Sequence, residues 1–314
     1  MGRSDALVTS IGLGTAQLGD LYDTLDQDRS TALVDAAWQA GIRYFDTAPH
    51  YGVGLAERRL GVALAGRPRD EYTLSSKVGR LLVPDAHGDP VRQWDFSADG
   101  VRRSIDASLT RLGLDRIDIA LIHDPEDHLE QAVGEAYPAL ERLREEGVIR
   151  AVGVGTGNMD VLSVFADRTD VDALMVAGRL TLLDHPALAG IVPVCEERGI
   201  SILNAGIFNS GLLANEHPDA ASRYEYAAVP PELLARARSL ASFAAAFGTT
   251  LPEAAMGFAA LPSPVASLVI GADTPEQLLT NVRRAERRPD LDALWRVLQA
   301  EGLIDASVRI AYRD

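Results

Sequence analysis

The sequence predicts an α/β protein, a single (β/α)8 TIM barrel that spans residues 1–314. Eight short apolar segments alternate with eight amphipathic segments whose apolar residues recur every three or four positions. The short segments are apolar at consecutive positions, as are parallel strands covered on both faces. Eight such units in a chain of 314 residues favour a closed barrel over an open sheet, and no long linker divides the chain.

The elements follow in a regular order. The expected strands are Val8–Leu13, Tyr44–Ala48, Tyr72–Val78, Ile117–Ile122, Ala151–Val154, Ala173–Ala177, Ser201–Asn204 and Leu268–Ile270. The expected helices are Ser30–Ala40, Ala56–Ala65, Ala98–Leu112, Leu129–Glu146, Val161–Ala166, Pro186–Arg198, Pro231–Phe247 and Pro275–Ala285. A glycine follows many of these helices, as is usual where a helix ends in a left-handed residue; these are Gly41, Gly113, Gly147, Gly199 and Gly248.

Two long irregular segments, Gly79–Phe96 and Leu213–Pro230, both follow strands rather than helices. Loops that follow strands lie on the C-terminal face of a barrel, where substrates bind. We therefore expect these two segments to form walls or a lid over the site.

Composition excludes several classes of protein. Acidic residues outnumber basic ones 45 to 30 and the net charge is −15, so a surface that binds nucleic acid is not expected. No apolar stretch approaches the roughly 20 residues that span a bilayer, and the first residues resemble no signal peptide. Cys195 is the single cysteine, and the six histidines show no metal-ligand spacing. We expect a cytoplasmic protein, monomeric or a small homo-oligomer, with a small-molecule partner and no metal.

Polar, titratable side chains stand at the ends of neighbouring expected strands. Asp46 ends the second strand, Lys77 lies near the end of the third, and His123 and Asp124 close the fourth, while Tyr51 follows Asp46 by five residues. Taken singly, an aspartate after a strand is often a helix cap and a histidine is often part of the core. A lysine within a buried strand, however, needs a carboxylate nearby. Together these residues predict a site at one side of the barrel mouth.

At this point the sequence resembles a known family. The segment Gly41–Gly52 (GIRYFDTAPHYG), with Glu57 after it, closely resembles the signature of the aldo-keto reductase superfamily. Ser76–Val78 and Leu121–Asp124 resemble its two further catalytic segments, and the resemblance runs over nearly the whole chain. Finer features resemble its sugar 1-dehydrogenase branch; these are Ala56–Gly61, Lys77–Arg80, His123–His128 and Phe208–Leu213.

The resemblance implies an NAD(P)-dependent oxidoreductase with four catalytic residues. Tyr51 would exchange a proton with the substrate oxygen while a hydride moves to or from the nicotinamide. A free tyrosine has a pKa near 10, and the ammonium of Lys77 would lower it. Asp46 would keep Lys77 charged and oriented, and His123 would hydrogen-bond the substrate oxygen.

The resemblance also implies where the dinucleotide lies. The glycine-rich strings Gly12–Thr15 and Gly153–Gly157 do not complete the fingerprint of a Rossmann domain. The pyrophosphate would instead lie after the seventh strand and the adenosine near the helix that follows the eighth, where free N–H groups favour an anion. The expected cofactor-binding residues are Gly14, Thr15, Asp46, Thr156, Asn158, Phe208, Asn209, Ser210, Gly211, Gly271, Asp273, Gln277 and Asn281.

The expected adenosine site departs from the family pattern. Gly271 and Gln277 stand where many members place a Lys and an Arg around the 2′-phosphate of NADP. Asp273 would repel a phosphate and can accept a hydrogen bond from a 2′-hydroxyl, although Arg283 or Arg284 can compensate. We therefore predict that NAD is used at least as well as NADP.

The expected nicotinamide site departs as well. The family usually holds the carboxamide with Ser-Asn and Gln, whereas this chain has Gly155–Asn158 and Arg179. Thr156 or Asn158 can substitute, and Phe208 either stacks on the nicotinamide or packs in the core.

The first expected activity is oxidation of an aldose of the L-fucose, D-arabinose or L-galactose type at C1, which yields a lactone. The expected substrate-binding residues are Tyr22, His50, Tyr51, Trp94, Phe96, His123 and Asp124. The alternatives are oxidation of pyridoxal and broad aldehyde or ketone reduction, which would use the same four catalytic residues. A nicotinamide-binding regulatory subunit is a further alternative, which the presence of all four catalytic residues disfavours.

Overall fold

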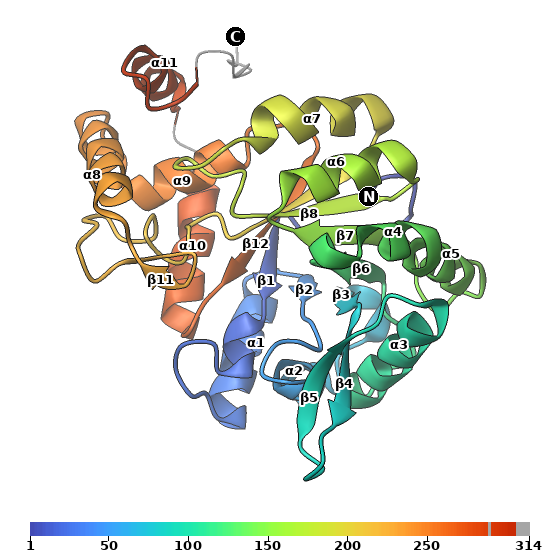
Figure 1. The fold of residues 1–314 in the computed structure, drawn as a ribbon. Coiled ribbons are helices and arrows are strands. Elements are labelled where there is room, and N and C mark those ends of the chain that lie inside the picture. Colours follow the sequence, from blue (N-terminus) through green and yellow to red (C-terminus); the bar gives the residue numbers. More distant parts are fainter. Residues whose placement is uncertain (288–289, 306–314) are drawn as a thin grey trace.

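The computed structural model describes residues 1–287 and 290–305. Eight parallel strands close into a barrel in the order β1-β12-β9-β8-β7-β6-β3-β2, with helices around it (Figure 1). The strands are β1 (Ile11–Gly14), β2 (Tyr44–Asp46), β3 (Thr73–Val78), β6 (Ile119–His123), β7 (Ala151–Thr156), β8 (Ala173–Ala177), β9 (Ser201–Ala205) and β12 (Val265–Gly271). The predicted (β/α)8 TIM barrel is therefore confirmed.

The helices lie outside the barrel (Figure 1). They are α1 (Gln27–Gln39), α2 (Leu55–Leu64), α3 (Ala98–Leu112), α4 (Leu129–Gln131), α5 (Tyr137–Glu145), α6 (Met159–Arg168), α7 (Ala187–Arg198), α8 (Pro231–Ala246), α9 (Leu251–Ala259), α10 (Pro275–Arg287) and α11 (Asp292–Ala300). The glycines expected after helices, from Gly41 to Gly248, all have φ between 66° and 81°. Left-handed termination of these helices is thus confirmed.

The segment expected as one helix, Leu129–Glu146, is interrupted by a π-turn, η4 (Ala132–Ala136). There the N–H of Tyr137 donates to the carbonyl of Ala132, five residues back. Pro138 follows directly and has no N–H to donate, so the regular α-helical ladder is not available at this point. The π-turn joins α4 to α5 without ending the helical path.

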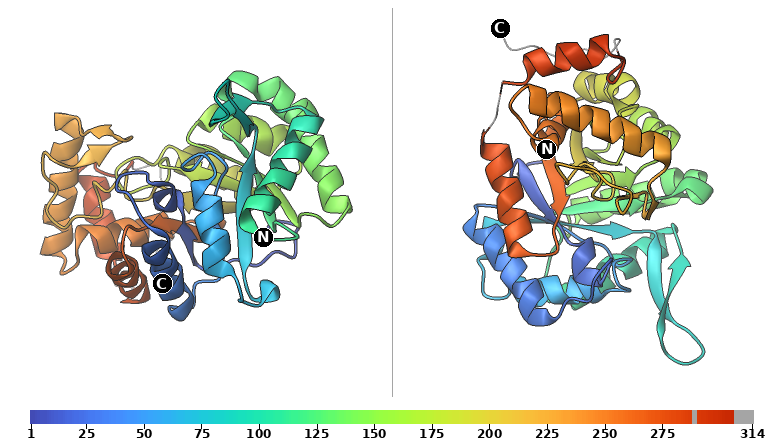
Figure 2. Two further views of the ribbon diagram at one scale, coloured as in Figure 1. Left: turned by 90° about the horizontal axis from the view of Figure 1, so that it is seen from below. Right: turned by 90° about the vertical axis from the view of Figure 1, so that its left-hand side faces the viewer.

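Both long segments after strands contain short antiparallel strands that the sequence did not predict. The first forms the hairpin of β4 (Arg80–Pro84) and β5 (Pro90–Trp94), which projects from the barrel (Figure 2, right). The second contains β10 (Arg223–Tyr224) and β11 (Ala227–Ala228). Every residue of β5 is exposed, so its sequence lacks the buried apolar pattern on which strand prediction depends.

The helices α9 and α11 are also additional to the predicted set. Residues of α9 are almost all buried, so they show no amphipathic period. A capping box between Thr250 and Glu253 begins α9, and the ring of Phe258 in α9 lies 5.7 Å from that of Trp295 in α11. These helices belong to a second apolar cluster, with α8, beside the barrel.

The barrel interior positions the residues at its mouth. Tyr44 in β2 points inward and is completely buried, with its ring against Gly12 in β1. A Cβ at Gly12 would lie 2.4 Å from the Cδ1 atom of Tyr44, so only glycine admits this ring. In the part of the chain that the structure describes, no helix is both long and apolar enough to cross a membrane.

Candidate active site

The side chain of Lys77 connects Asp46 to Tyr51. Its Nζ donates hydrogen bonds to both carboxylate oxygens of Asp46, at 2.9 and 2.8 Å, and to the carbonyl of Thr47 at 2.9 Å. It also donates to the hydroxyl of Tyr51 at 3.1 Å. Lys77 and Asp46 are almost completely buried. The ammonium therefore has four oxygen acceptors, and its pKa is raised because the nearby carboxylate and phenol outweigh the effect of burial.

A chain of buried hydroxyls extends behind Asp46. Ser75 donates to Oδ1 of Asp46 at 2.6 Å, and the hydroxyl of Tyr44 lies 3.0 Å from Oγ of Ser75. Because the single serine proton is used on Asp46, Tyr44 donates to Ser75. These bonds fix the carboxylate through Oδ1, the oxygen that also accepts from Lys77. Neither Tyr44 nor Ser75 was predicted as a site residue. Both lie within buried strands, where the sequence alone does not distinguish a hydroxyl of the site from one in the core.

Two opposing effects act on Tyr51. Burial raises the pKa of its phenol, Lys77 lowers it and Asp46 raises it, with a net increase. Lys77 does lower the pKa of Tyr51, as expected, but burial and Asp46 together raise it by more. Because an ordinary tyrosine has a pKa near 10, a phenol whose pKa is raised further keeps its proton at neutral pH.

His123 ends β6 and its ring lies edge-on to that of Tyr51, with centroids 6.2 Å apart. Burial, Lys77 and Arg80 hold the pKa of His123 well below its ordinary value. The imidazole is therefore neutral and can present an N–H donor to a substrate oxygen. Asp46, Tyr51, Lys77 and His123 thus converge as the sequence predicts.

Arg80 was not predicted as a site residue, yet it links two that were. Its Nη2 donates to the carboxylate of Asp124, and its Nη1 lies 3.1 Å from Nδ1 of His50. The guanidinium lies over the ring of Trp94, 4.4 Å from the centroid. Arg80 follows Gly79, whose φ of 100° turns the chain out of β3 into the hairpin. A positive charge directly after a glycine at a strand end was the available signal.

The expected aromatic substrate contacts divide into two groups. Trp94, the last residue of β5, is 48% exposed, and Tyr22, in the segment before α1, is 36% exposed. Phe96 is completely buried beneath Trp94, with centroids 5.9 Å apart, and its ring fills the space that a Cβ on Gly79 would need. The prediction that Phe96 contacts the substrate is therefore wrong, because its ring packs in the core and supports Trp94.

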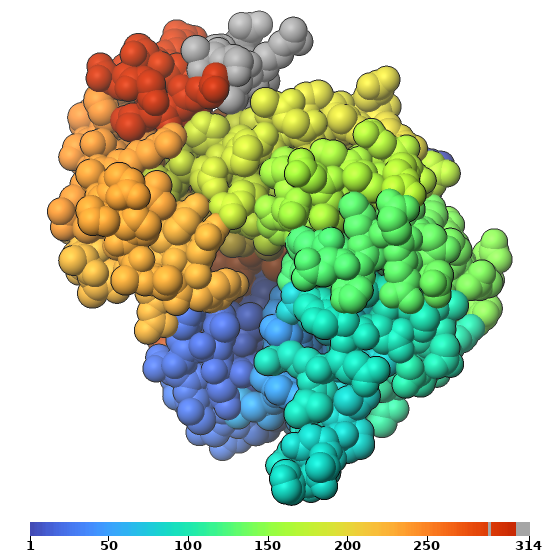
Figure 3. All heavy atoms as spheres, in the orientation of Figure 1, coloured from blue at the N-terminus to red at the C-terminus, as the bar shows by residue number. Residues whose placement is uncertain are grey.

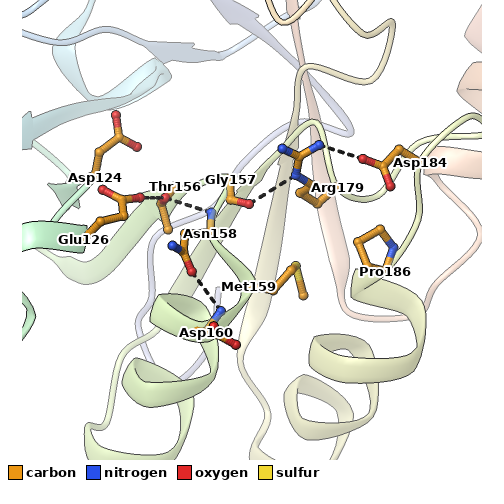
Figure 4. Close-up of a pocket in the computed structure, with 10 residues that line it drawn as sticks. All are labelled: Asp124, Glu126, Thr156, Gly157, Asn158, Met159, Asp160, Arg179, Asp184 and Pro186. Carbon is orange, nitrogen blue, oxygen red and sulfur yellow. Dashed lines mark hydrogen bonds and ion pairs between the residues drawn. The ribbon is translucent and has the colours of Figure 1, made fainter. Parts of the chain in front are cut away.

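A pocket of about 510 Å³ lies beside Asp124, at the ends of β6, β7 and β8 (Figure 4). Thr156 donates its hydroxyl to the carboxylate of Glu126, and the side chain of Asn158 accepts the N–H groups of Asp160 and Val161 that begin α6. The side-chain oxygen of each is thus bonded within the protein. The pocket is lined by Asp124, Glu126, Thr156, Gly157, Asn158, Met159, Asp160, Arg179, Asp184 and Pro186.

Arg179 occupies the far wall of this pocket. It bonds Asp184 at 2.6 Å and the carbonyl of Gly157 at 3.3 Å, and it also pairs with Glu225 at the turn between β10 and β11. It therefore ties the second long loop to the barrel mouth. Arginine differs from the family's usual glutamine here, and the structure gives it a role in holding this loop.

The loop after β9 has an unusual backbone. Asn209, Ser210 and Gly211 have φ of 47°, 58° and 94°, a run that turns the chain tightly. Oγ of Ser210 accepts the N–H of Tyr226, and Nδ2 of Asn209 reaches the carbonyl of Gly178 at 3.5 Å. Phe208 packs against both apolar clusters, as its packing alternative predicts.

The expected adenosine end lies where β1 and β12 pair. Gly14 pairs with Gly271, and the side chain of Gln17 lies so close to Gly271 that a Cβ there would be 2.4 Å from its Nε2. The backbone N–H of Asp273 donates to the side chain of Gln277 at 2.9 Å. Gln17 was not predicted as a site residue.

Thr15 and Asn281 are buried beneath this surface. The hydroxyl of Thr15 donates to the carbonyl of Asp46 at 2.9 Å, and the side-chain oxygen of Asn281 accepts from Arg284 at 3.2 Å. Thr15 therefore holds the backbone of Asp46 in place, and Asn281 holds the side chain of Arg284.

Three buried acceptors without a protein donor line the expected cofactor path. They are Oε1 of Gln17, Oδ1 of Asn209 and Oδ1 of Asp273, after the neighbouring strands β1, β9 and β12. A dinucleotide carries ribose hydroxyls and an amide that can donate to such acceptors, so these residues fit the group. Figure 3 shows the surface hollowed between the loop after β9 and the segments after β1 and β3. Within residues 1–287 and 290–305, no three His, Cys, Asp or Glu side chains are grouped to hold a metal ion.

Comparisons with known proteins identify the family of this chain. The model of the aldo/keto reductase family matches residues 10–293. The chain is 44% identical to a D-threo-aldose 1-dehydrogenase of Pseudomonas sp, over 88% of this chain and 89% of that protein. It is 35% identical to a pyridoxal 4-dehydrogenase of Microbacterium luteolum, over 97% of each, and 30% identical to an L-galactose dehydrogenase of Arabidopsis thaliana, over 90% and 86%.

Solved structures lead to the same family. The holo form of an aldo-keto reductase from Bacillus halodurans covers 100% of this chain and 98% of its own, with a TM-score of 0.79 and 27% identity. A glycerol dehydrogenase from Gluconobacter oxydans has a TM-score of 0.73 at 24% identity, over 97% and 96%, and this likeness concerns the fold alone. The chain belongs to the aldo/keto reductase family and is an NAD(P)-dependent oxidoreductase.

Proposed function

We propose that this enzyme oxidises an aldose at C1 to the corresponding lactone, with Tyr51 as the acid/base. The observation that carries the proposal is the bridge of Lys77 between the carboxylate of Asp46 and the hydroxyl of Tyr51. The substrate class rests on the similarity to the D-threo-aldose 1-dehydrogenase, over most of both chains. The L-fucose, D-arabinose and L-galactose type of sugar is the class proposed.

The chemical step moves one hydride and one proton. A bound nicotinamide supplies the acceptor for the hydride that leaves C1 of the sugar ring. Tyr51, as phenolate, takes the proton of the C1 hydroxyl, and the C–O bond becomes the carbonyl of the lactone. Lys77 stabilises the phenolate before that transfer, and the neutral N–H of His123 orients the reacting oxygen. In the reverse direction the Tyr51 phenol donates its proton to the carbonyl oxygen.

We also propose that the enzyme uses NAD at least as well as NADP. The carboxylate of Asp273 has a buried oxygen without a protein donor, which can accept a bond from a 2′-hydroxyl. The pKa of Asp273 is raised by burial and by the negative charge of Asp23, although Arg29 lowers it. The 2′-phosphate of NADP would bring a further negative charge to this acidic surrounding and would be repelled. Gly271 and Gln277 add no positive charge at the positions where many relatives have Lys and Arg.

A second candidate is oxidation of pyridoxal, which the 35% identity to a pyridoxal 4-dehydrogenase over 97% of both chains favours. The four proposed catalytic residues would serve both reactions, so they do not discriminate. The surroundings of Asp124 do favour a polyol, because Glu126 and Asp184 supply further acceptors for hydroxyl groups in the adjacent pocket.

A substrate panel tests the proposal. Purified enzyme is assayed for cofactor reduction with L-fucose, D-arabinose, L-galactose and pyridoxal, and for cofactor oxidation with aldehydes and ketones. We expect the highest kcat/KM for one of the sugars, with a lactone as the product by mass spectrometry. A higher kcat/KM for pyridoxal would replace the first candidate by the second, and turnover of simple carbonyls alone would reject both.

A further inference from the structure

We infer that Arg80 is a positioning residue that presents His50 as an Nε2–H donor and Asp124 as an acceptor beside His123. The structure thereby favours substrates with a hydroxyl group next to the reacting carbon. This specificity rests on the proposed function, whereas the states of the two side chains can be measured without any substrate.

The guanidinium of Arg80 is the common anchor. One of its nitrogens bonds the carboxylate of Asp124 and another bonds Nδ1 of His50. The Arg80 side chain is only 14% exposed, and its Cζ atom lies 4.4 Å from the ring centroid of Trp94. His50 comes from the turn after β2 and Asp124 from the end of β6, so a residue of the hairpin β4–β5 holds together two otherwise separate segments. Because both bond one guanidinium, His50 and Asp124 lie within reach of one small ligand.

The contact determines which ring nitrogen of His50 carries the proton. A guanidinium has donors and no acceptor, so Nδ1 of His50 accepts the bond from Arg80. The proton of the neutral ring then lies on Nε2. Burial, Arg80, Arg92 and Lys77 lower the pKa of His50 to about 4, and the facing ring of His123 is neutral. His50 therefore remains a neutral donor throughout the neutral pH range.

The same anchor holds Asp124 as an acceptor. Oδ2 of Asp124 bonds Arg80 and lies 3.5 Å from Nε2 of His123. Asp124 directly follows β6 and has a φ of 41°, in the left-handed region. Burial and Glu126 raise the pKa of Asp124, while Arg80 and Lys77 lower it. Without Arg80 this carboxylate would lose its direct cationic partner and its fixed orientation.

Histidine tautomers in solution test the anchor directly. Protein labelled with ¹⁵N-histidine is recorded without cofactor or sugar in long-range ¹H–¹⁵N spectra, and the His50 signals are assigned by their loss in His50→Gln. We expect the Nε2–H tautomer in the wild type, with no titration between pH 5 and 8. In Arg80→Met, which keeps an unbranched chain against Trp94, we expect both tautomers and a pKa that is higher than about 4.

Arg92→Met is the matched control. Arg92 lies on β5 and donates to the backbone carbonyl of His50 at 3.3 Å, so its removal takes away a neighbouring positive charge without freeing Nδ1. The Nε2–H tautomer should persist in this variant. A wild-type His50 with its proton on Nδ1, or an Arg80→Met spectrum identical to that of the wild type, would overturn the inference.

Kinetics with a sugar and its 2-deoxy form test the specificity. We expect Arg80→Met to raise KM for the sugar about ten- to hundredfold, which is the usual effect of losing a hydrogen bond to a charged group. The change in kcat should be smaller. The wild type should prefer the sugar over its 2-deoxy form, and Arg80→Met should lose that preference. Arg80→Lys keeps one charge but not the two-nitrogen fork, so it should restore little of it.

These two measurements separate the failures. If no sugar is oxidised at all, the proposed function fails while the tautomer result still decides the role of Arg80. If sugars are oxidised but Arg80→Met keeps the wild-type preference over the 2-deoxy form, the inference fails while the proposed function stands. If Arg80→Met does not fold, Arg80→Lys and the wild-type tautomer carry the test.

Discussion

The Nζ atom of Lys77 lies 3.1 Å from the hydroxyl of Tyr51 and within 2.9 Å of both oxygens of Asp46. One buried ammonium thus connects a carboxylate to the phenol at the barrel mouth. The pair is charged and almost completely buried, so each charge depends on the other. This coupling has consequences for stability and for catalysis that can be measured separately.

Removal of one partner of the Lys77–Asp46 pair should destabilise the protein more than removal of both. Lys77→Met leaves a buried carboxylate without its cation, which costs about 3–5 kcal/mol of unfolding free energy. The double variant Lys77→Met/Asp46→Asn removes both charges and should recover part of that loss. Urea denaturation of the wild type, both single variants and the double variant measures the coupling. Additive losses would mean that the two side chains do not interact as the distances indicate.

The raised pKa of Tyr51 predicts opposite pH profiles for the two directions of reaction. Oxidation requires the phenolate, so its kcat/KM should rise with pH and continue to rise to at least about pH 10. Reduction requires the phenol, so its kcat/KM should be level through neutral pH and fall only in the alkaline range. His123 stays neutral because its pKa lies well below 6.5, so neither profile should change slope near that pH. An oxidation rate that levels off below pH 8 would contradict the raised pKa.

Asp273 should reduce the use of NADP relative to NAD. Asp273→Ser removes a carboxylate beside the expected 2′ position, which should improve NADP binding about tenfold and weaken NAD binding slightly. Glu286→Gln, an exposed acid near the other end of α10, is the charge-matched control and should leave the ratio unchanged. Dissociation constants from fluorescence titration and kcat/KM values for both cofactors provide the measurement. A hundredfold preference of the wild type for NADP would reject the proposal.

Much of the barrel could be predicted because its strands are buried on both faces. The continuous apolar runs of β8 and the amphipathic period of α3 give the bounds of those elements without error. The hairpin of β4 and β5 could not be predicted in this way, since its pairing is local and most of its residues face solvent. The helix α9 was missed because it is buried on nearly all sides and so carries no period.

The candidate site shows the same division. Asp46, Lys77 and His123 could be found because polar residues at the ends of buried strands are unusual and neighbouring strands bring them together. Arg80 was missed although it directly follows Gly79, because its bonds to His50 and Asp124 depend on the turn that the chain makes at this glycine. Phe96 was misplaced for a related reason. Sequence alternation does not reveal which of two nearby aromatic rings, Trp94 or Phe96, lies underneath.

The account depends most on Tyr51 as the group that exchanges a proton with the substrate. The direct test compares Tyr51→Phe with the wild type in turnover of the best sugar of the panel and in the dissociation constant for NAD. We predict a loss of kcat of about a thousandfold or more, with a dissociation constant that changes less than about twofold, because only the hydroxyl is removed. A variant that turns over at the wild-type rate while it binds NAD normally would contradict the central claim.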